Sequence, residues 1–282
     1  MSEGRDAKHL RAFGEACGSS LLDVHTDVDH HRAVFTLAGP TDGDAADAVR
    51  GLARAVADRV DLAHHRGVHP RLGALDVVPF VALEGSTSED AVAAARAFAR
   101  WAADALALPT FLYDDADPDH RTLPETRRDA FVTRAPDFGP AAPHSNLGAV
   151  AVGARPVLVA VNCVLDRDDL TLARDLAHEV RERDGGLSGV RALGLSLVSV
   201  GRAQVSMNLI ALERTGVQEA CELVRARARA AGSDVMRVEL VGLIPAAELG
   251  RCDSEFLDWA QLSSDQTIES RLAQAAGGSS AY

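Results

Sequence analysis

The stretch VLVAVNCVL, Val157–Leu165, is apolar except for Asn162, and its length and valine content predict a buried β-strand. Leucines and a valine at helical spacing then predict a helix over Asp168–Arg183. Two strands are expected next, Val190–Val200 and Ala203–Leu212, joined by a turn at Gly201. A helix over Gly216–Ala231 and a last strand over Val238–Leu243 follow. This order, βαββαβ, is the ferredoxin-like pattern.

The first half of the chain repeats most of that order. The expected helices are Asp6–Cys17, Gly43–His64 and Ser88–Leu106. The expected strands are Ser20–Thr26 and Ala33–Gly39 after the first helix, Ala74–Leu83 after the second and Thr110–Tyr113 after the third. The pattern is the same one with its first strand missing, followed by an added helix and strand. Such a first strand is central in its sheet, so its neighbours would be left unpaired. Either the sequence starts late or another segment fills the gap.

These patterns predict an α+β protein of two ferredoxin-like βαββαβ subdomains, over residues 1–152 and 153–282. Between the last expected strand of the first half and the second half lies Asp114–Gly153, which contains five prolines and little periodicity. We therefore expect a long loop there. Loops of this length inside a compact domain are usually functional or disordered.

The composition excludes several classes of protein. The formal net charge of -12 over 282 residues argues against nucleic-acid binding, which needs clustered lysine and arginine. No apolar run reaches the roughly 20 residues that cross a bilayer, and the first residues lack the apolar core of a secretory signal. The four cysteines are widely spaced, which favours reduced thiols in the cytoplasm. An anionic ligand would need a local group of arginines.

The densest group of chemically capable residues is HHRGVHPRLGALD, His64–Asp76, at the junction of an expected helix and strand. Gly67 and Pro70 should end the helix and fix a loop that presents His69. Histidine suits proton transfer near neutral pH. Two alternative interpretations remain. His64 and His65 can be ordinary residues at the C-terminal end of a helix, and His69 can have a structural role instead of a catalytic one. A metal site is disfavoured for two reasons. Gly67 and Pro70 prevent His65 and His69 from lying on one face of a helix, and no HExxH motif or cysteine partner is present.

Two other polar segments are candidates. The first, Asp27–Arg32, lies between two expected strands and is either a polar hairpin turn or a segment that presents Arg32 to a carboxylate. The second, Ala135–Pro140, is either a solvated loop or part of a binding site. No GxGxxG, Walker or GxSxG motif is present, so neither nucleotide binding nor that form of hydrolase is supported.

Taken together, these segments resemble glutamate formiminotransferase, the folate-dependent enzyme of histidine breakdown. The resemblance covers most of the chain, and its most specific part is the His-Pro-Arg-x-Gly-Ala-x-Asp core. The matching stretches, in the family's order, are DVDHHRAVFTLAGP, HHRGVHPRLGALDVVPF, RTLPETRR, APDFGP, VGARPVLVAVNCVL, AQVSMNL and ELVGLIP.

The resemblance implies transfer of the formimino group of N-formimino-L-glutamate to N5 of tetrahydrofolate, in a tunnel between two subdomains, usually of a homodimer. It implies that His69 is catalytic, and Arg71, Arg32 and Arg155 are candidates for binding substrate carboxylates. The folate-binding stretch falls on GPAAPHSNLG, that is Gly139, Pro140, Ala141, Ala142, Pro143, His144, Ser145, Asn146, Leu147 and Gly148. Tetrahydrofolate would be a co-substrate, and no metal is expected.

Several departures from the family leave the donor open. The family begins with a strand resembling Val-Pro-Asn-Phe, whereas here Ser2 to Gly4 directly follow Met1. His31 stands where relatives commonly have asparagine, and we include it among the substrate-binding candidates. The chain leaves no room for a fused cyclodeaminase, so we expect a monofunctional enzyme. The alternatives are transfer from another formimino or formyl amino acid, or a non-catalytic folate-binding homologue.

Overall fold

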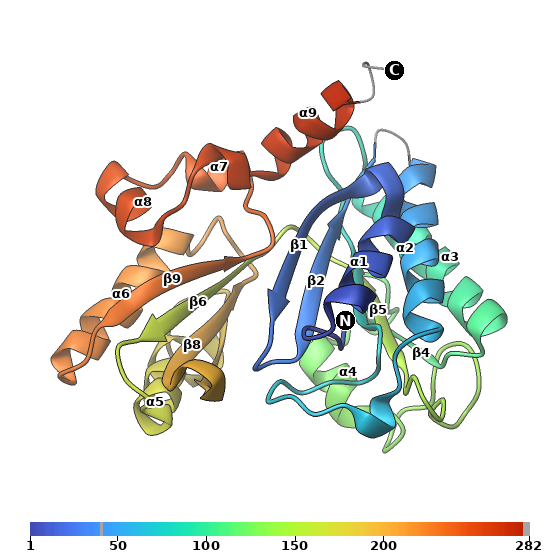
Figure 1. Cartoon of the computed structure of the whole chain (residues 1–282), viewed down its shortest axis with the longest axis horizontal. Coiled ribbons are helices and arrows are strands. Elements are labelled where there is room, and N and C mark those ends of the chain that lie inside the picture. Colours follow the sequence, from blue (N-terminus) through green and yellow to red (C-terminus); the bar gives the residue numbers. More distant parts are fainter. Residues whose placement is uncertain (40–41, 279–282) are drawn as a thin grey trace. The chain divides into compact units, whose positions relative to one another are not determined.

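The computed structural model describes residues 1–39 and 42–278, and it confirms an α+β protein with two sheet-containing subdomains. The chain divides into two compact units, Met1–Val157 and Leu158–Tyr282, which we call unit 1 and unit 2 (Figure 1). The boundary that we predict after residue 152 falls within strand β5 (Val150–Ala154) and stays a prediction. No helix among the described residues is long and apolar enough to span a bilayer.

Unit 2 has the strand order that a ferredoxin-like sheet requires. Its four strands are all antiparallel to their neighbours and follow the order β7-β8-β6-β9, so the first and third strands of the motif are central. The six elements of the motif are β6 (Val159–Leu165), α5 (Leu170–Val180), β7 (Val190–Leu197), β8 (Arg202–Leu209), α6 (Val217–Ala230) and β9 (Val235–Val241). Three helices follow: α7 (Ala246–Leu249), α8 (Ser254–Ala260) and α9 (Ile268–Gly278).

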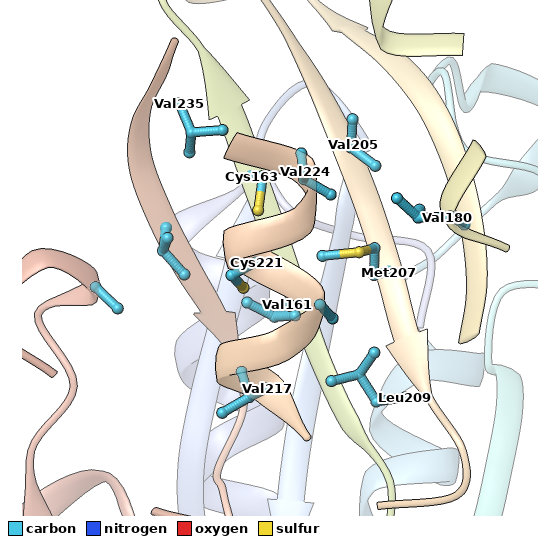
Figure 2. Packing of buried hydrophobic residues seen from close by; sticks show 14 of the residues in the cluster. Val161, Cys163, Val180, Val205, Met207, Leu209, Val217, Cys221, Val224 and Val235 are labelled. Atoms are coloured by element: carbon cyan, nitrogen blue, oxygen red, sulfur yellow. The ribbon is translucent and has the colours of Figure 1, made fainter. Parts of the chain in front are cut away.

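The core of unit 2 lies between its sheet and helices α5 and α6. Alternate residues of the central strands are fully buried beneath the helices, as the period of two requires. Figure 2 shows Val217, Cys221 and Val224 of α6 facing the sheet, where side chains such as Val161 and Met207 lie. Burial of these aliphatic side chains stabilises each by about 1.5–3 kcal/mol relative to exposure.

Unit 1 combines an antiparallel hairpin with a parallel sheet. Strands β1 (Leu21–Asp27) and β2 (Arg32–Leu37) form the hairpin, and β3 (Asp76–Phe80) and β4 (Thr110–Asp114) flank β5 in parallel. The helices of unit 1 are α1 (Ala7–Cys17), α2 (Asp42–Ala57), α3 (Ser88–Leu106) and α4 (Leu123–Asp129). Helix α1 packs on α2, and α3 packs on the parallel sheet.

Met1 and Ser2 form backbone hydrogen bonds to two segments of unit 1. The backbone N–H of Ala33 donates to the Met1 carbonyl over 3.1 Å, and the Met1 amine donates back over 2.8 Å. On the other side, Ser2 N donates to Ala74 O over 2.7 Å. These two residues therefore join β2 to the segment that precedes β3, and the first strand expected from the pattern stays a prediction.

Two predictions about unit 1 are wrong in detail. The helix expected over Gly43–His64 ends at Ala57, and a separate 3-10 turn, Leu62–His64, follows, in which Asp61 accepts from Ala63 N. The long loop expected over residues 114–153 contains α4 and β5. Helix α4 begins with a reciprocal capping box. Strand β5 is buried on both faces, so it has no alternating pattern to reveal it.

Candidate active site

The loop between α2 and β3 is held at its end by Asp76. This residue is fully buried and adopts a left-handed backbone conformation with φ of 62°. Its Oδ1 accepts from Leu72 N over 2.6 Å, which closes the loop upon itself. Its Oδ2 accepts from Arg127 Nη2 over 2.7 Å and from Arg32. One buried carboxylate thus fixes the loop and binds two guanidinium groups.

His69 lies half-buried in this loop, among polar groups. Its Nδ1 is 2.7 Å from the Pro70 carbonyl oxygen. Because a carbonyl can only accept, Nδ1 carries the proton, and Nε2 of the neutral ring carries the lone pair. The same carbonyl accepts from Arg127 Nη1 over 2.6 Å. The ring is therefore held in the tautomer that leaves Nε2 able to accept a proton.

The surroundings of His69 favour its neutral form. Burial and the Arg32 guanidinium lower the pKa of His69 to about 3, with smaller contributions from Arg127 and His30, while the Pro70 carbonyl acts in the opposite direction. The His30 ring lies 5.6 Å from that of His69, centroid to centroid. At pH 7 the ring is therefore neutral.

A second chain of contacts supports the loop from the N-terminal side. His31 Nε2 lies 3.1 Å from Glu3 Oε1, and the His31 ring stacks on that of His65 with centroids 3.9 Å apart. Arg71 bonds to Nδ1 of His65 and, over 2.8 Å, to the Gly67 carbonyl. Because arginine only donates, His65 accepts at Nδ1 and is neutral; burial and the charge of His31 lower its pKa to about 4.

The structure brings three of the four predicted substrate-binding residues to this loop. Arg32 and Arg71 bond to groups of the loop itself, and His31 stacks on one of its rings. Arg155 lies just after β5, where its backbone N–H donates to Phe80 O and its side chain to Pro156 O. The backbone bond of Arg155 therefore lies at the ends of β3 and β5.

The predicted folate-binding stretch lies against the same loop. Residues His144 and Gly148 exchange backbone hydrogen bonds, which makes a tight turn within Gly139–Gly148. The turn is tied to the segment after His69, because Ala74 N donates to Leu147 O over 2.8 Å. A Cβ on Gly73 would lie 1.8 Å from Ala149 O, so only glycine permits this approach. Two segments far apart in sequence thus form one surface within unit 1.

Two residues of this site were missed by the sequence analysis. Arg127 bonds to both Asp76 and Pro70, and the buried His30 lies beside His69. The sequence did hold a signal for Arg127: Thr122 and Glu125 match a capping box, which predicts a helix start and places Arg127 on it. The prolines nearby favoured a loop instead.

The arrangement supplies proton transfer and positive charge. No group of three His, Cys, Asp or Glu suited to a metal ion occurs among the described residues. Arg32 and Arg127 share one carboxylate, so a net positive charge remains beside a neutral imidazole. Such a site can bind an anionic substrate and move a proton between two of its nitrogens.

Comparisons with known proteins place this chain in one family. Residues 1–155 match the formiminotransferase domain, N-terminal subdomain, and residues 160–274 match the formiminotransferase domain. The chain belongs to the formiminotransferase family.

Curated relatives are similar over most of the chain. A glutamate formimidoyltransferase of Streptococcus pyogenes is 35% identical over 82% of this chain and 81% of its own length. One of Thermoplasma acidophilum is 32% identical over 98% of this chain and 96% of its own length. A formimidoyltransferase-cyclodeaminase of Sus scrofa is 34% identical over 88% of this chain, which corresponds to 50% of that longer protein.

Proposed function

We propose that this chain transfers the formimino group of N-formimino-L-glutamate to tetrahydrofolate, with His69 as the proton shuttle. The products are 5-formiminotetrahydrofolate and L-glutamate. Family membership supports the reaction. The observation that carries the role of His69 is its hydrogen bond to Pro70 O, which leaves Nε2 as a base.

The chemistry follows from the state of the His69 ring. Folate N5 attacks the formimino carbon, and a bond between N5 and that carbon forms as a tetrahedral intermediate develops. Nε2 of His69 accepts the proton from N5 and returns it to the nitrogen of the departing glutamate. The bond between the formimino carbon and that nitrogen then breaks. The ring begins and ends neutral, so no proton is gained or lost overall.

Arginines near His69 bind the carboxylates of the donor. The contacts of Arg32 with Asp76 and Pro70 are made by its Nη1. A guanidinium carries five N–H donors, so the other side of this fork is suited to a substrate carboxylate. Arg71, Arg155 and His31 are further donor-binding candidates. Bound carboxylates offset the positive charge that lowers the pKa of His69, so the ring becomes a stronger base when the donor is bound.

The stretch from Gly139 to Gly148 binds the folate. Its turn is fixed to the segment after His69 by the bond from Ala74 N to Leu147 O, which supports delivery of N5 to the catalytic loop. Tetrahydrofolate acts as a co-substrate, and the two reactants meet in an oriented way. We further propose that the enzyme works in the cytoplasm as a homodimer.

The reaction is tested by mixing the purified protein with tetrahydrofolate and formiminoglutamate and measuring the methenyl-folate absorbance after acidification. The wild-type protein should give the chromophore, and His69→Ala should lose about 100- to 10,000-fold in kcat. His64→Ala is the matched control, because His64 is an exposed histidine of the preceding 3-10 turn. The reaction is refuted if the wild type gives no chromophore, and the role of His69 is refuted if His69→Ala turns over at the wild-type rate.

A further inference from the structure

Arg127 reaches the catalytic loop from a separate helix. It lies in α4, whose start is fixed by the Thr122–Glu125 capping box. The preceding residue, Thr126, is fully buried and accepts a hydrogen bond from Arg134 over 3.1 Å, which sets the rotation of the helix. The guanidinium group of Arg127 donates to two acceptors, Pro70 O at 2.6 Å and Asp76 Oδ2 at 2.7 Å.

Of the two arginines on Asp76, Arg127 makes the closer contact with the Pro70 carbonyl oxygen. Arg32 Nη1 lies 3.4 Å from Pro70 O, whereas Arg127 Nη1 lies 2.6 Å from it. The Pro70 carbonyl is the group that accepts the Nδ1 proton of His69. Arg127 therefore orients the acceptor that sets the tautomer of the catalytic ring.

We propose that Arg127, bridged to Asp76, is a positioning residue that fixes the Pro70 carbonyl and thereby the Nδ1–H tautomer and orientation of His69. This inference rests on the proposed role of His69. Arg127 acts through the loop and does not need to contact either substrate. Its side chain is 18% exposed and Asp76 is fully buried, so the bridge is shielded from solvent and defines one geometry.

Charge gives Arg127 a second effect on His69. The charged and titratable groups that act on the ring are Arg32, Arg127 and His30, and Asp76 lies behind the two arginines. The Arg127 cation disfavours protonation of the ring. An arginine that supported the fold without its charge reaching His69 would leave the pH at which His69 titrates unchanged, so the pH profile separates the two cases.

The test measures kcat, KM for each substrate and the pH dependence of kcat/KM in Arg127→Gln and Arg127→Lys. For Arg127→Gln we expect kcat to fall roughly 10- to 100-fold, because the loop loses its fixed geometry, with both KM values nearly unchanged. The acid limb of kcat/KM should move to higher pH, because a cation beside His69 is lost. Arg127→Lys keeps the charge but cannot bridge two acceptors, so it should have a low kcat and an acid limb close to that of the wild type.

Arg128→Gln is the matched control, since Arg128 lies on the same helix, is exposed and pairs with the adjacent Asp129. It should retain the wild-type kcat and pH profile. The proposal is overturned if Arg127→Gln keeps the wild-type kcat, or loses kcat without any movement of the acid limb. If Arg127→Gln fails to fold, Arg127→Lys decides, because a wild-type kcat in it overturns the proposal. If His69→Ala is inactive and the Arg127 variants are fully active, only the role of Arg127 is refuted. If His69→Ala is active, the proton shuttle itself is refuted.

Discussion

The hydrophobic core of unit 2 and the polar group around Asp76 in unit 1 differ in the side chains that they bury. The core of unit 2 is built from aliphatic side chains and small residues between one antiparallel sheet and two helices. Unit 1 also has an apolar core, but beside it the fully buried Asp76 binds two arginines and closes a loop. Aliphatic packing tolerates many sequences of similar volume. A buried charge requires its partners, because an unpaired one is costly.

Because of this difference, residues that affect only stability and residues that affect activity as well can be distinguished within one chain. The hydrophobic core of unit 2 is apolar, and the charged groups buried in this unit, Glu248 and Arg181, bond at its margin to Val217 N and Asp184. In unit 1 the buried charges hold His69, so a single change there should affect both stability and turnover. Substitutions in the two regions should therefore give different combinations of lost stability and lost activity.

The largest effect is expected for Asp76→Asn. This change leaves Arg32 and Arg127 largely buried without their carboxylate, which should cost about 3–5 kcal/mol of unfolding free energy. Turnover of the folded fraction should also fall, because the loop loses its closing bond to Leu72 N. Chemical denaturation and steady-state assays measure both. Asp129→Asn, at the exposed pair with Arg128, should change neither; equal effects of the two substitutions would contradict the comparison.

An apolar deletion in unit 2 is expected to affect stability alone. Met207 is 1% exposed in the core beneath the helices, so Met207→Ala should cost about 2–5 kcal/mol. At a temperature where the variant is folded, kcat should equal that of the wild type. A loss of turnover comparable to that of Asp76→Asn would show that the two regions do not differ in this way.

The smallest expected effect is a loss of stability at acid pH that depends on Glu3. Burial alone would raise the pKa of Glu3, but backbone N–H groups of Arg5 and Asp6 and the charge of His31 lower it from 4.5 to about 2. A carboxyl whose pKa is lower in the folded state stabilises the fold above its unfolded pKa. That stabilisation should be lost as the pH falls from 4.5 to about 2.

The check is thermal unfolding of Glu3→Gln and wild type at several pH values. The wild type should lose more stability than Glu3→Gln as the pH falls through this window. Glu15→Gln, at an exposed glutamate of α1, should behave like the wild type. Identical pH dependence in all three proteins would refute the contribution of Glu3.

Where local pattern decides structure, the sequence was sufficient. Helix α3 occupies the predicted residues, Ser88–Leu106, because its apolar period and its start signal agree. The elements of unit 2 were also found, β6 from its long apolar run and helices α5 and α6 from their apolar period. Strand β5 was missed because all five of its residues are buried between two parallel neighbours, so no alternation marks it.

The site was predictable in part, for a related reason. Gly67, His69 and Pro70 are adjacent in sequence, so their loop could be inferred from residue types alone. Arg127 is separated from Asp76 by 51 residues, and nothing local indicates that they meet. The roles of Arg32 and Arg127 on one carboxylate depend on tertiary contacts, which residue spacing does not encode.

The protonation state of His69 is the most direct test of this account. In the free enzyme, with histidine labelled by ¹⁵N, the His69 signal can be assigned by its loss in His69→Ala. The account predicts a neutral ring at pH 7 with the proton on Nδ1 and the lone pair on Nε2, and a pKa well below that of an exposed histidine. A ring that is protonated at pH 7, or that carries its proton on Nε2, would contradict it.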